Sequence, residues 1–357
     1  MRLLKRRTVT GSLRQRLEQA VGERVFPGCV LGVVGRGENI VIPAGKLTYD
    51  SDAPAVSENT IYDVASVTKA IPVSCGALKL MEKKALSACD LMIRYLPEYN
   101  GSYREKIRIS HLLTHTLDFD FRLSSCKDLS PKEMLSAIFN AGLRSEPGKR
   151  FFYANATSIL LGLVVEKVSG LPLDRTADEF FFKPLCMDRT TFFPEKLDRE
   201  WIAPTEFDPW RNRIIRGEVH DESAWALRPH VIAGSAGVFS TVPDLMKFAG
   251  MLIAGGKYAG REYFTNETIP LMHANQRPPG SGEWTGLGWE LNQEYMGSVR
   301  NGHRFGKTGF TGCVVVIDPL ESRGFILLSN HTYPKRRDSR DLINKVRRDI
   351  ADLVFGK

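Results

Sequence analysis

Ser66-Val67-Thr68-Lys69 is the stretch of this sequence that decides its fold, together with two short motifs that follow it. The later motifs are Tyr153-Ala154-Asn155 and Lys307-Thr308-Gly309. A serine hydroxyl is a weak nucleophile at neutral pH, so it needs a nearby proton acceptor, and the acyl-enzyme that it forms needs donors for a developing oxyanion. The three motifs can supply these parts, so they indicate a nucleophilic serine hydrolase.

The spacing of the first motif has a physical reason. Residues at i and i+3 share one face of a helix, which brings the Ser66 hydroxyl under the Lys69 amine. The apolar residues of 70–84 and its basic end predict a helix there, after an extended lead-in over 60–65. Ser66 is then near a helix N-terminus, where free N–H groups and the helix dipole favour negative charge on its oxygen.

The chain holds a second Ser-x-x-Lys match, Ser124-Ser125-Cys126-Lys127. It lies in a polar stretch with no helical pattern after it, so nothing is predicted to hold its serine and lysine on one face. The Tyr-x-Asn and Lys-Thr-Gly motifs each occur once and in the needed order. This context favours Ser66 over Ser124.

With these motifs the chain resembles the class C β-lactamases and penicillin-binding-protein-like serine hydrolases, which include esterases and D-amino-acid peptidases. The resemblance covers nearly the whole chain. Four further stretches carry it: His111-Leu112-Leu113-Thr114-His115-Thr116, Glu146-Pro147-Gly148, Ala233-Gly234-Ser235-Ala236-Gly237 and Gly286-Leu287-Gly288-Trp289. It implies a β-lactamase/transpeptidase-like fold, and it identifies the fold better than the substrate.

By the same resemblance, Ser66 is the nucleophile, Lys69 its partner and Tyr153 the general base and acid. The chemistry of the side chains alone leaves the base open. A tyrosine that is ionised at neutral pH needs its pKa lowered by about 3 units, or roughly 4 kcal/mol. A lysine base needs a similar lowering, for which desolvation and a second cation act in the right direction. Strongly coupled groups can also share the titration.

The resemblance also implies substrate-binding residues. Asn155 would guide the substrate and Lys69, and Lys307 of the Lys307-Thr308-Gly309 motif would lie beside Tyr153. The backbone N–H groups of Ser66 and Phe310 would form the oxyanion hole. Lys307 is a cation that can pair with a substrate carboxylate, which favours β-lactam or peptide substrates. The lack of an evident export signal favours a cytoplasmic esterase or amidase instead, so both substrate classes stay open.

A rival nucleophile is Ser235, in a stretch that misses the Gly-x-Ser-x-Gly elbow by one alanine. Asp318 and His331 follow it in the order that an esterase triad needs. However, the residues from Thr241 onward have the pattern of a capped helix start. We therefore interpret 233–237 as a tight turn of small residues against the site.

No metal or cofactor is predicted. His111 and His115 have the i, i+4 spacing of two zinc ligands, but no glutamate follows His111 and no third ligand is visible nearby. A packed helix with two hydrogen-bonded histidines is the favoured interpretation. The six cysteines are dispersed without a Cys-x-x-Cys pair, which is typical of reduced core residues.

Composition limits the partners. The net charge of +8 gathers partly in 2–7 and 335–348, but without a nucleic-acid motif these are better read as solvated faces. No apolar run is long enough to span a membrane, and no signal peptide is evident. We expect a cytoplasmic enzyme with a small-molecule substrate, no nucleic-acid partner and an oligomeric state that the sequence leaves open.

The predicted fold class is α/β (α+β). Hairpins are expected from 29–34 with 40–42 and from 313–317 with 324–329, and helices over 134–140, 156–169, 241–254 and 338–355. The chain is then one catalytic unit, 1–357. Residues 1–64 and 285–357 form an antiparallel sheet region flanked by helices, and 65–284 form a mostly helical inserted region, with the active site at the junction.

We therefore expect a serine acyl hydrolase that forms an acyl-enzyme on Ser66 and hydrolyses a small ester, amide or β-lactam. One alternative is a binding or assembly module on the same fold with little turnover. The other is the esterase centred on Ser235. The presence of Ser66, Lys69 and Tyr153 favours the hydrolase over the binding module.

Overall fold

A seven-stranded antiparallel sheet joins the two ends of the chain. The computed structural model describes residues 2–35, 37–228, 230–278 and 280–356, and the side chains of 2–8 and 38 are outside this description. The strand order is β2-β1-β13-β12-β11-β10-β9. The strands are β1 (Gly28–Gly35), β2 (Glu38–Gly45), β9 (Trp284–Thr285), β10 (Glu290–Leu291), β11 (Phe305–Thr308), β12 (Val314–Asp318) and β13 (Arg323–Ser329).

Both predicted hairpins are confirmed. β1 pairs with β2 and β12 with β13, and β1 also pairs with β13, which places the first strand beside the last. Arg36, in the turn of the first hairpin, lies outside the described residues. The mixed fold with an antiparallel sheet built from both ends is as the sequence predicts.

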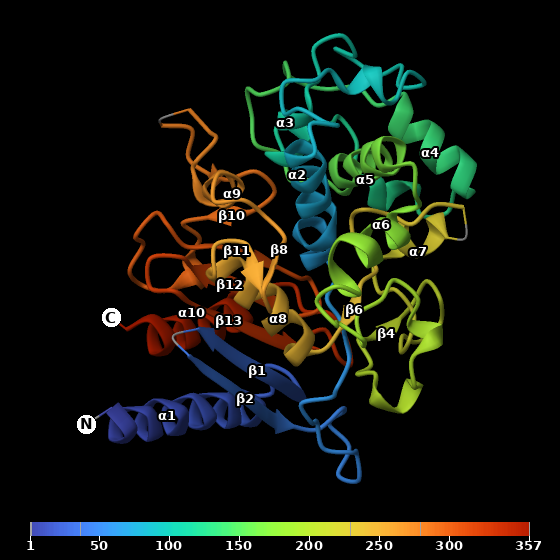
Figure 1. The fold of residues 1–357 in the computed structure, drawn as a ribbon. Helices are drawn as coiled ribbons and strands as arrows, with labels where there is room; N and C mark the ends of the chain where they lie inside the picture. Colours follow the sequence, from blue (N-terminus) through green and yellow to red (C-terminus); the bar gives the residue numbers. More distant parts are fainter. Residues whose placement is uncertain (1, 36, 229, 279, 357) are drawn as a thin grey trace.

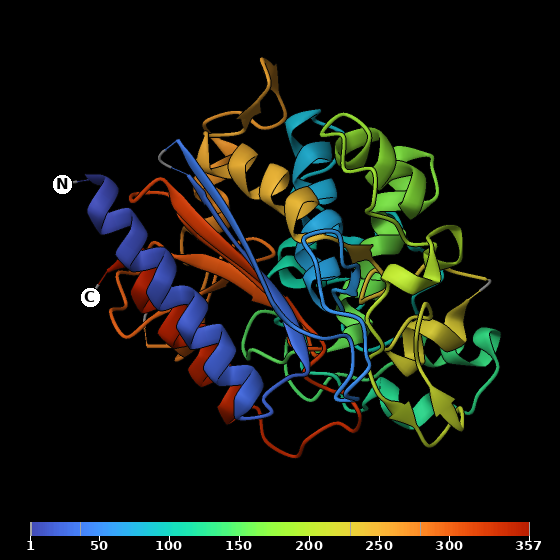
Figure 2. The same ribbon diagram turned by 90° about the horizontal axis from the view of Figure 1, so that it is seen from below.

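Helices cover both faces of this sheet. α1 (Arg2–Gly22) and α10 (Asp341–Phe355) run side by side across one face, and α8 (Val242–Ile253) covers the other (Figure 2). β1 faces both layers, since Val30 contributes to the core under α8 and Leu31 to the core under α1 and α10. α8 comes from the inserted region 65–284 and yet packs on β1 and β13. The boundary at 284 stays a prediction.

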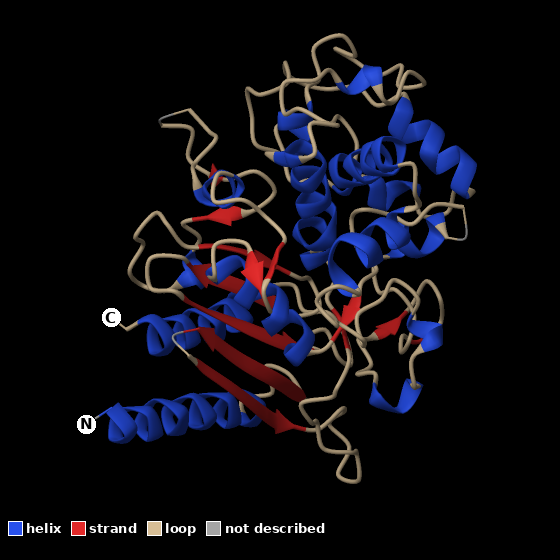
Figure 3. Ribbon diagram, in the orientation of Figure 1, coloured by secondary structure: helices blue, strands red, loops and turns tan. Residues whose placement is uncertain are grey.

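The remaining helices gather beside the sheet (Figures 1 and 3). They are α2 (Cys75–Glu82), α3 (Ile109–Leu113), α4 (Pro131–Phe139), α5 (Asn155–Ser169), α6 (Leu173–Ala177), α7 (Glu222–Leu227) and α9 (Thr268–His273). The predicted helix over 134–140 has its capping box, with Ser130 and Glu133 each bonding the other's backbone. α5 ends at Gly170, whose φ of 73° is the left-handed conformation that glycine tolerates.

Three short strand pairs lie outside the main sheet. β3 (Tyr62–Asp63) pairs with β6 (Phe239–Ser240), β4 (Phe207–Asp208) with β5 (Arg213–Ile214), and β7 (Lys257–Tyr258) with β8 (Arg261–Glu262). The β3–β6 pair matters most for the site, because it ties the segment before Ser66 to the segment that follows Ser235.

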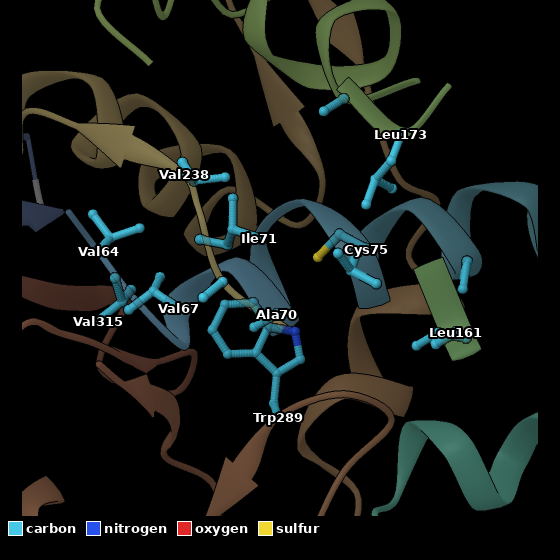
Figure 4. Packing of buried hydrophobic residues seen from close by; sticks show 14 of the residues in the cluster. Val64, Val67, Ala70, Ile71, Cys75, Leu161, Leu173, Val238, Trp289 and Val315 are labelled. Atoms are coloured by element: carbon cyan, nitrogen blue, oxygen red, sulfur yellow. The ribbon is translucent and has the colours of Figure 1, made fainter. Parts of the chain in front are cut away.

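The prediction of one helix over 70–84 is wrong at its start. A wide helical segment, η1 (Lys69–Ser74), is interrupted by extended backbone at Ile71 (φ −118°, ψ 111°), and the regular helix α2 begins at Cys75. Pro72 explains the break, because a residue before proline is disfavoured in the helical conformation. The segment is instead held by its packing: Val67, Ala70 and Ile71 are buried around Trp289 and Val315 (Figure 4).

None of the described helices is by itself long and apolar enough to cross a membrane. α5 meets that test only together with Leu173–Phe182, to which it is joined at a bend of 74°.

Candidate active site

Ser66 and Lys69 lie in direct contact. The Lys69 Nζ donates to the Ser66 Oγ at 2.9 Å and to the carbonyl oxygen of Ser235 at 2.7 Å. Lys69 is only 2% exposed, because the segment that carries it is packed into the core. The ammonium group is therefore fixed against the hydroxyl by a backbone acceptor on a different element.

Tyr153 lies between two ammonium groups. The Lys307 Nζ is 4.5 Å and the Lys69 Nζ 5.1 Å from the centre of its ring. Desolvation of the phenol opposes ionisation, but the charges of Lys307 and Lys69 and a hydrogen bond with Ser66 outweigh it, so the pKa of Tyr153 lies below its usual value. Although the residue is 42% exposed overall, this arrangement suits its phenol to exchange a proton with the Ser66 hydroxyl.

Lys307 is not a free cation. It is 1% exposed on β11, and its Nζ donates to Glu290 Oε1 at 2.6 Å. Desolvation acts to lower the pKa of Lys307, but the charges of Glu290 and Tyr153 raise it overall. The sequence-based suggestion that Lys307 receives a substrate carboxylate is therefore not supported, since a carboxylate of the protein already occupies its ammonium group.

Two residues that line the pocket have unpaired backbone donors. Among the described residues, neither the N–H of Ser66 nor that of Phe310 donates to a protein acceptor, and both residues line one pocket of about 560 Å³ with Thr308. A Cβ on Gly309 would stand 2.4 Å from the carbonyl oxygen of Val64, so only glycine lets the end of β11 approach this segment. Free N–H groups at such a junction are the donors that an oxyanion needs.

Asn155 lies in the same pocket, but its contacts differ from the expectation. Its Nδ2 donates to Asp221 Oδ2 at 2.9 Å and to Ser223 Oγ at 3.4 Å. The polar partner of Lys69 in this structure is the Ser235 carbonyl. Asn155 therefore lines the pocket wall with its amide nitrogen bound to Asp221, and the expected contact with Lys69 is made by the Ser235 carbonyl instead.

The rival site around Ser235 is not formed. Ser235 is fully buried, and its hydroxyl has no partner among the described residues. Asp318 pairs with Arg304 at 2.8 Å, and the His331 Nδ1 lies 2.6 Å from the carbonyl oxygen of Val25. The tight turn is explained by Gly234, where a Cβ would stand 2.3 Å from the Ser158 carbonyl oxygen.

His115 is a site residue that the sequence reasoning missed. α3 ends at Leu113, so His111 and His115 do not share a helix, and the predicted helical pair is wrong. His115 has a φ of 51°, is 8% exposed, and its ring lies 4.9 Å from that of Tyr153 at 32°. No cluster of three or more metal-ligating side chains occurs in the described part of the chain.

Arginines form one wall of the pocket, which the sequence reasoning treated only as a basic surface. Arg336, Arg340 and Arg347 all line it. Arg336 pairs with Glu206 and Glu222, whereas Arg340 and Arg347 have no ion pair with any described residue. The Arg347 guanidinium is 2% exposed and donates to the carbonyl oxygens of Gly309 and Cys313. The pocket therefore has two arginines on one wall that no carboxylate of the described residues neutralises within ion-pair distance.

Comparison with known proteins agrees with this geometry. The sequence profile of the family described as Beta-lactamase matches residues 13–348. The chain belongs to the β-lactamase family. This membership shows a serine hydrolase of the penicillin-binding-protein-like kind.

Two relatives from different bacteria carry the same name. A protein of Escherichia coli strain K12 named "Putative D-alanyl-D-alanine carboxypeptidase" is 30% identical over 303 residues, which cover 76% of this chain and 69% of that protein. A Salmonella typhi protein of the same name is 27% identical and covers 77% and 70%.

Solved structures show the same fold. EstCE1, "a hydrolase with promiscuous acyltransferase activity", has a TM-score of 0.78 at 21% identity and covers 98% of this chain and 99% of its own. The octameric penicillin-binding protein homologue from Pyrococcus abyssi has a TM-score of 0.73 at 24% identity and covers 91% and 74%. At these identities the likeness concerns the fold alone.

Proposed function

We propose that the protein is a serine acyl hydrolase that forms an acyl-enzyme on Ser66 and cleaves carboxylate-bearing amides of the D-alanyl-D-alanine type, or the β-lactams that resemble them. The contact of the Ser66 hydroxyl with a buried Lys69, under a tyrosine of lowered pKa, carries the proposal. The unpaired arginines at the same pocket favour an anionic substrate.

The proposed acylation step uses groups of four residues of the chain. The coupled pair of Tyr153 and Lys69 takes the proton from the Ser66 Oγ as that oxygen bonds to the substrate carbonyl carbon. The N–H groups of Ser66 and Phe310 stabilise the resulting oxyanion, for which one such donor is typically worth about a hundredfold to a thousandfold in rate. The carbon–nitrogen bond then breaks, and the proton passes to the leaving amine.

Deacylation repeats the same steps with water as the nucleophile. The Tyr153 and Lys69 pair takes a proton from water, the carbonyl carbon of the ester accepts the new oxygen, and the proton returns to the Ser66 Oγ as the acid leaves. Lys307 contributes a second positive charge beside the phenol in both halves. The serine is regenerated, and no cofactor enters these steps.

The substrate carboxylate is assigned to the arginine wall. Arg340 lies over the ring of Phe310 at 4.8 Å, next to the oxyanion donor, and Arg347 lies beneath Gly309. A guanidinium binds a carboxylate through two parallel hydrogen bonds, which orients the substrate as well as attracting it.

The test uses one peptide in two forms, ending in D-alanyl-D-alanine with a free carboxylate or with a carboxamide. We expect Ser66-dependent release of the terminal residue, with kcat/KM at least about tenfold higher for the free acid, because one charge-assisted hydrogen bond is worth about this much. Arg340→Ala should remove most of this preference. Equal rates on both peptides would show that the enzyme does not recognise the substrate carboxylate, which contradicts this assignment.

A short-chain ester hydrolase is the second candidate. The exposed Trp284 and the ring of Phe310 give the pocket an apolar portion that suits an uncharged acyl group. Turnover of a p-nitrophenyl ester together with inertness toward both peptides would select this candidate.

A further inference from the structure

Glu290 lies beside the reacting groups, and the role assigned to it rests on the proposed function. We infer that Glu290 is a positioning residue: its carboxylate holds Lys307 against Tyr153 and cancels one of the two positive charges that face the phenol. No motif contains this residue. It directly follows Gly286-Leu287-Gly288-Trp289, on strand β10.

Strand register brings Glu290 to Lys307. Glu290 pairs with Gly306 across the β10–β11 ladder, so its backbone lies one residue from that of Lys307, and the side-chain contact is made at the end of this short ladder. The salt bridge is 2.6 Å long, and the lysine side chain is 2% exposed against 21% for the glutamate. A buried ammonium group needs such a partner to remain charged.

A second contact fixes the orientation of the carboxylate. The Tyr295 hydroxyl donates to Glu290 Oε2 at 2.7 Å, while Oε1 accepts from Lys307. Both oxygens are therefore used, and the carboxylate cannot turn without losing one of these bonds. Glu290 still lines the pocket that contains Ser66 and Tyr153, so it acts at the edge of the reacting groups.

The charges around Tyr153 determine the direction of its effect. Lys69 and Lys307 favour the phenolate, Glu290 disfavours it, and the His115 ring lies against the phenol ring at a tilt of 32°. Burial and the two lysines lower the pKa of His115 well below its usual value, so its imidazole is neutral. Glu290 itself faces Lys307, Tyr295 and the more distant charge of Arg347. Removing its charge therefore leaves Tyr153 beside two uncompensated cations.

The consequence is a compromise between binding and basicity. Without Glu290, the phenol would ionise more readily but would be a weaker base, and Lys307 would be free to attract the substrate carboxylate away from the arginine wall. With Glu290 in place, Lys307 acts on Tyr153 and is withheld from the substrate. Glu290 thus determines which cations of the pocket can bind an anion.

The test is an optical titration of Tyr153, obtained as the difference between a protein and its Tyr153→Phe counterpart. In Glu290→Gln the midpoint of Tyr153 should fall by about one pH unit, the size expected when one neighbouring charge is lost. Tyr295→Phe, which keeps the charge and removes only a hydrogen bond, should leave the midpoint nearly unchanged. Glu290→Asp keeps the charge on a shorter side chain, so its Tyr153 midpoint should be intermediate. It replaces Glu290→Gln in the test where that variant does not fold.

The kinetic readout separates this inference from the proposed function. The acidic limb of kcat/KM should move in the same direction in Glu290→Gln, and the preference for the free-acid peptide over its carboxamide should depend less on Arg340. An unchanged or raised Tyr153 midpoint in Glu290→Gln would overturn the inference. Because the titration needs no substrate, inactivity of the wild type on every peptide and ester would overturn only the proposed function.

Discussion

Ser66–Lys69 and Ser124–Lys127 present the same spacing of serine and lysine in two regions of the molecule. Lys69 is buried and touches the Ser66 hydroxyl. Lys127 follows a short turn, η3 (Leu123–Cys126), with its Nζ 5.5 Å from the ring centre of Trp210, and Ser124 is exposed. The first lysine faces a hydroxyl and the second faces an aromatic ring.

The difference lies in what the rest of the chain brings to each motif. Around Ser66 the fold gathers the Ser235 carbonyl, Tyr153 and Lys307, which come from three other parts of the chain. Ser-x-x-Lys supplies only two of the groups that acyl transfer needs. A catalytic site also needs groups such as Tyr153 and Lys307. The fold, through the sheet and the β3–β6 pair, brings such groups to Ser66 and not to Ser124.

The largest effect expected from this comparison is on the serines. Ser66→Ala should lower kcat/KM for the D-alanyl-D-alanine peptide by at least about a thousandfold, because no other group can form the acyl-enzyme. Ser124→Ala is the matched control and should stay within about twofold of the wild type, as surface substitutions do. Steady-state kinetics on the two variants measure this. Equal losses would erase the distinction between the two motifs.

The lysines repeat the comparison with a smaller effect. Lys69→Met keeps the apolar stem and removes the ammonium group that contacts Ser66, so kcat should fall by about a hundredfold to a thousandfold. Lys127→Met should leave kcat unchanged and cost only the interaction with Trp210. Initial rates at saturating substrate give kcat for both variants. Full activity in Lys69→Met would show that Tyr153 needs no help from this lysine.

Acid should weaken the fold at the buried His331. Burial lowers the pKa of His331 to about 4, although its bond to Val25 acts in the other direction. Since the unfolded state binds this proton more readily, the stabilisation is complete above about pH 6.5 and is lost as pH falls toward about 4, by about 3 kcal/mol. Urea unfolding of wild type and His331→Gln across this range measures it. The variant should show a flatter dependence, and equal slopes would contradict the assignment.

The smallest effect is expected at a third serine. Ser235→Ala keeps the backbone carbonyl that accepts from Lys69 and removes a buried hydroxyl without a partner. Activity should therefore stay within about threefold, and stability should hold or rise slightly. Thermal unfolding and kcat/KM on the same preparation check both statements. Inactivation would return Ser235 to consideration as the nucleophile.

The sequence predicts local features of this fold well. The capping box at Ser130 and Glu133, the glycine that ends α5 and the two hairpins have signals within a few residues of where they act. The break at Ile71 also has a local signal, because Pro72 follows it in the sequence. The apolar pattern of 70–84 nevertheless predicts an unbroken helix.

The site was predictable where motifs mark it and not where register builds it. Glu290 meets Lys307 because β10 pairs with β11, and Arg347 reaches Gly309 from α10, which packs against β13. His115 reaches Tyr153 through a left-handed backbone after α3, which its helical spacing to His111 does not reveal. Contacts of this kind follow from tertiary packing, so a single sequence does not contain a local sign of them.

The most direct test of the account is intact-protein mass spectrometry after brief exposure to benzylpenicillin and acid quench. Wild type and Ser124→Ala should carry one penicilloyl increment or release hydrolysed penicillin, and Ser66→Ala should do neither. An increment retained in Ser66→Ala, or lost in Ser124→Ala alone, would contradict the claim that Ser66 is the nucleophile of this site.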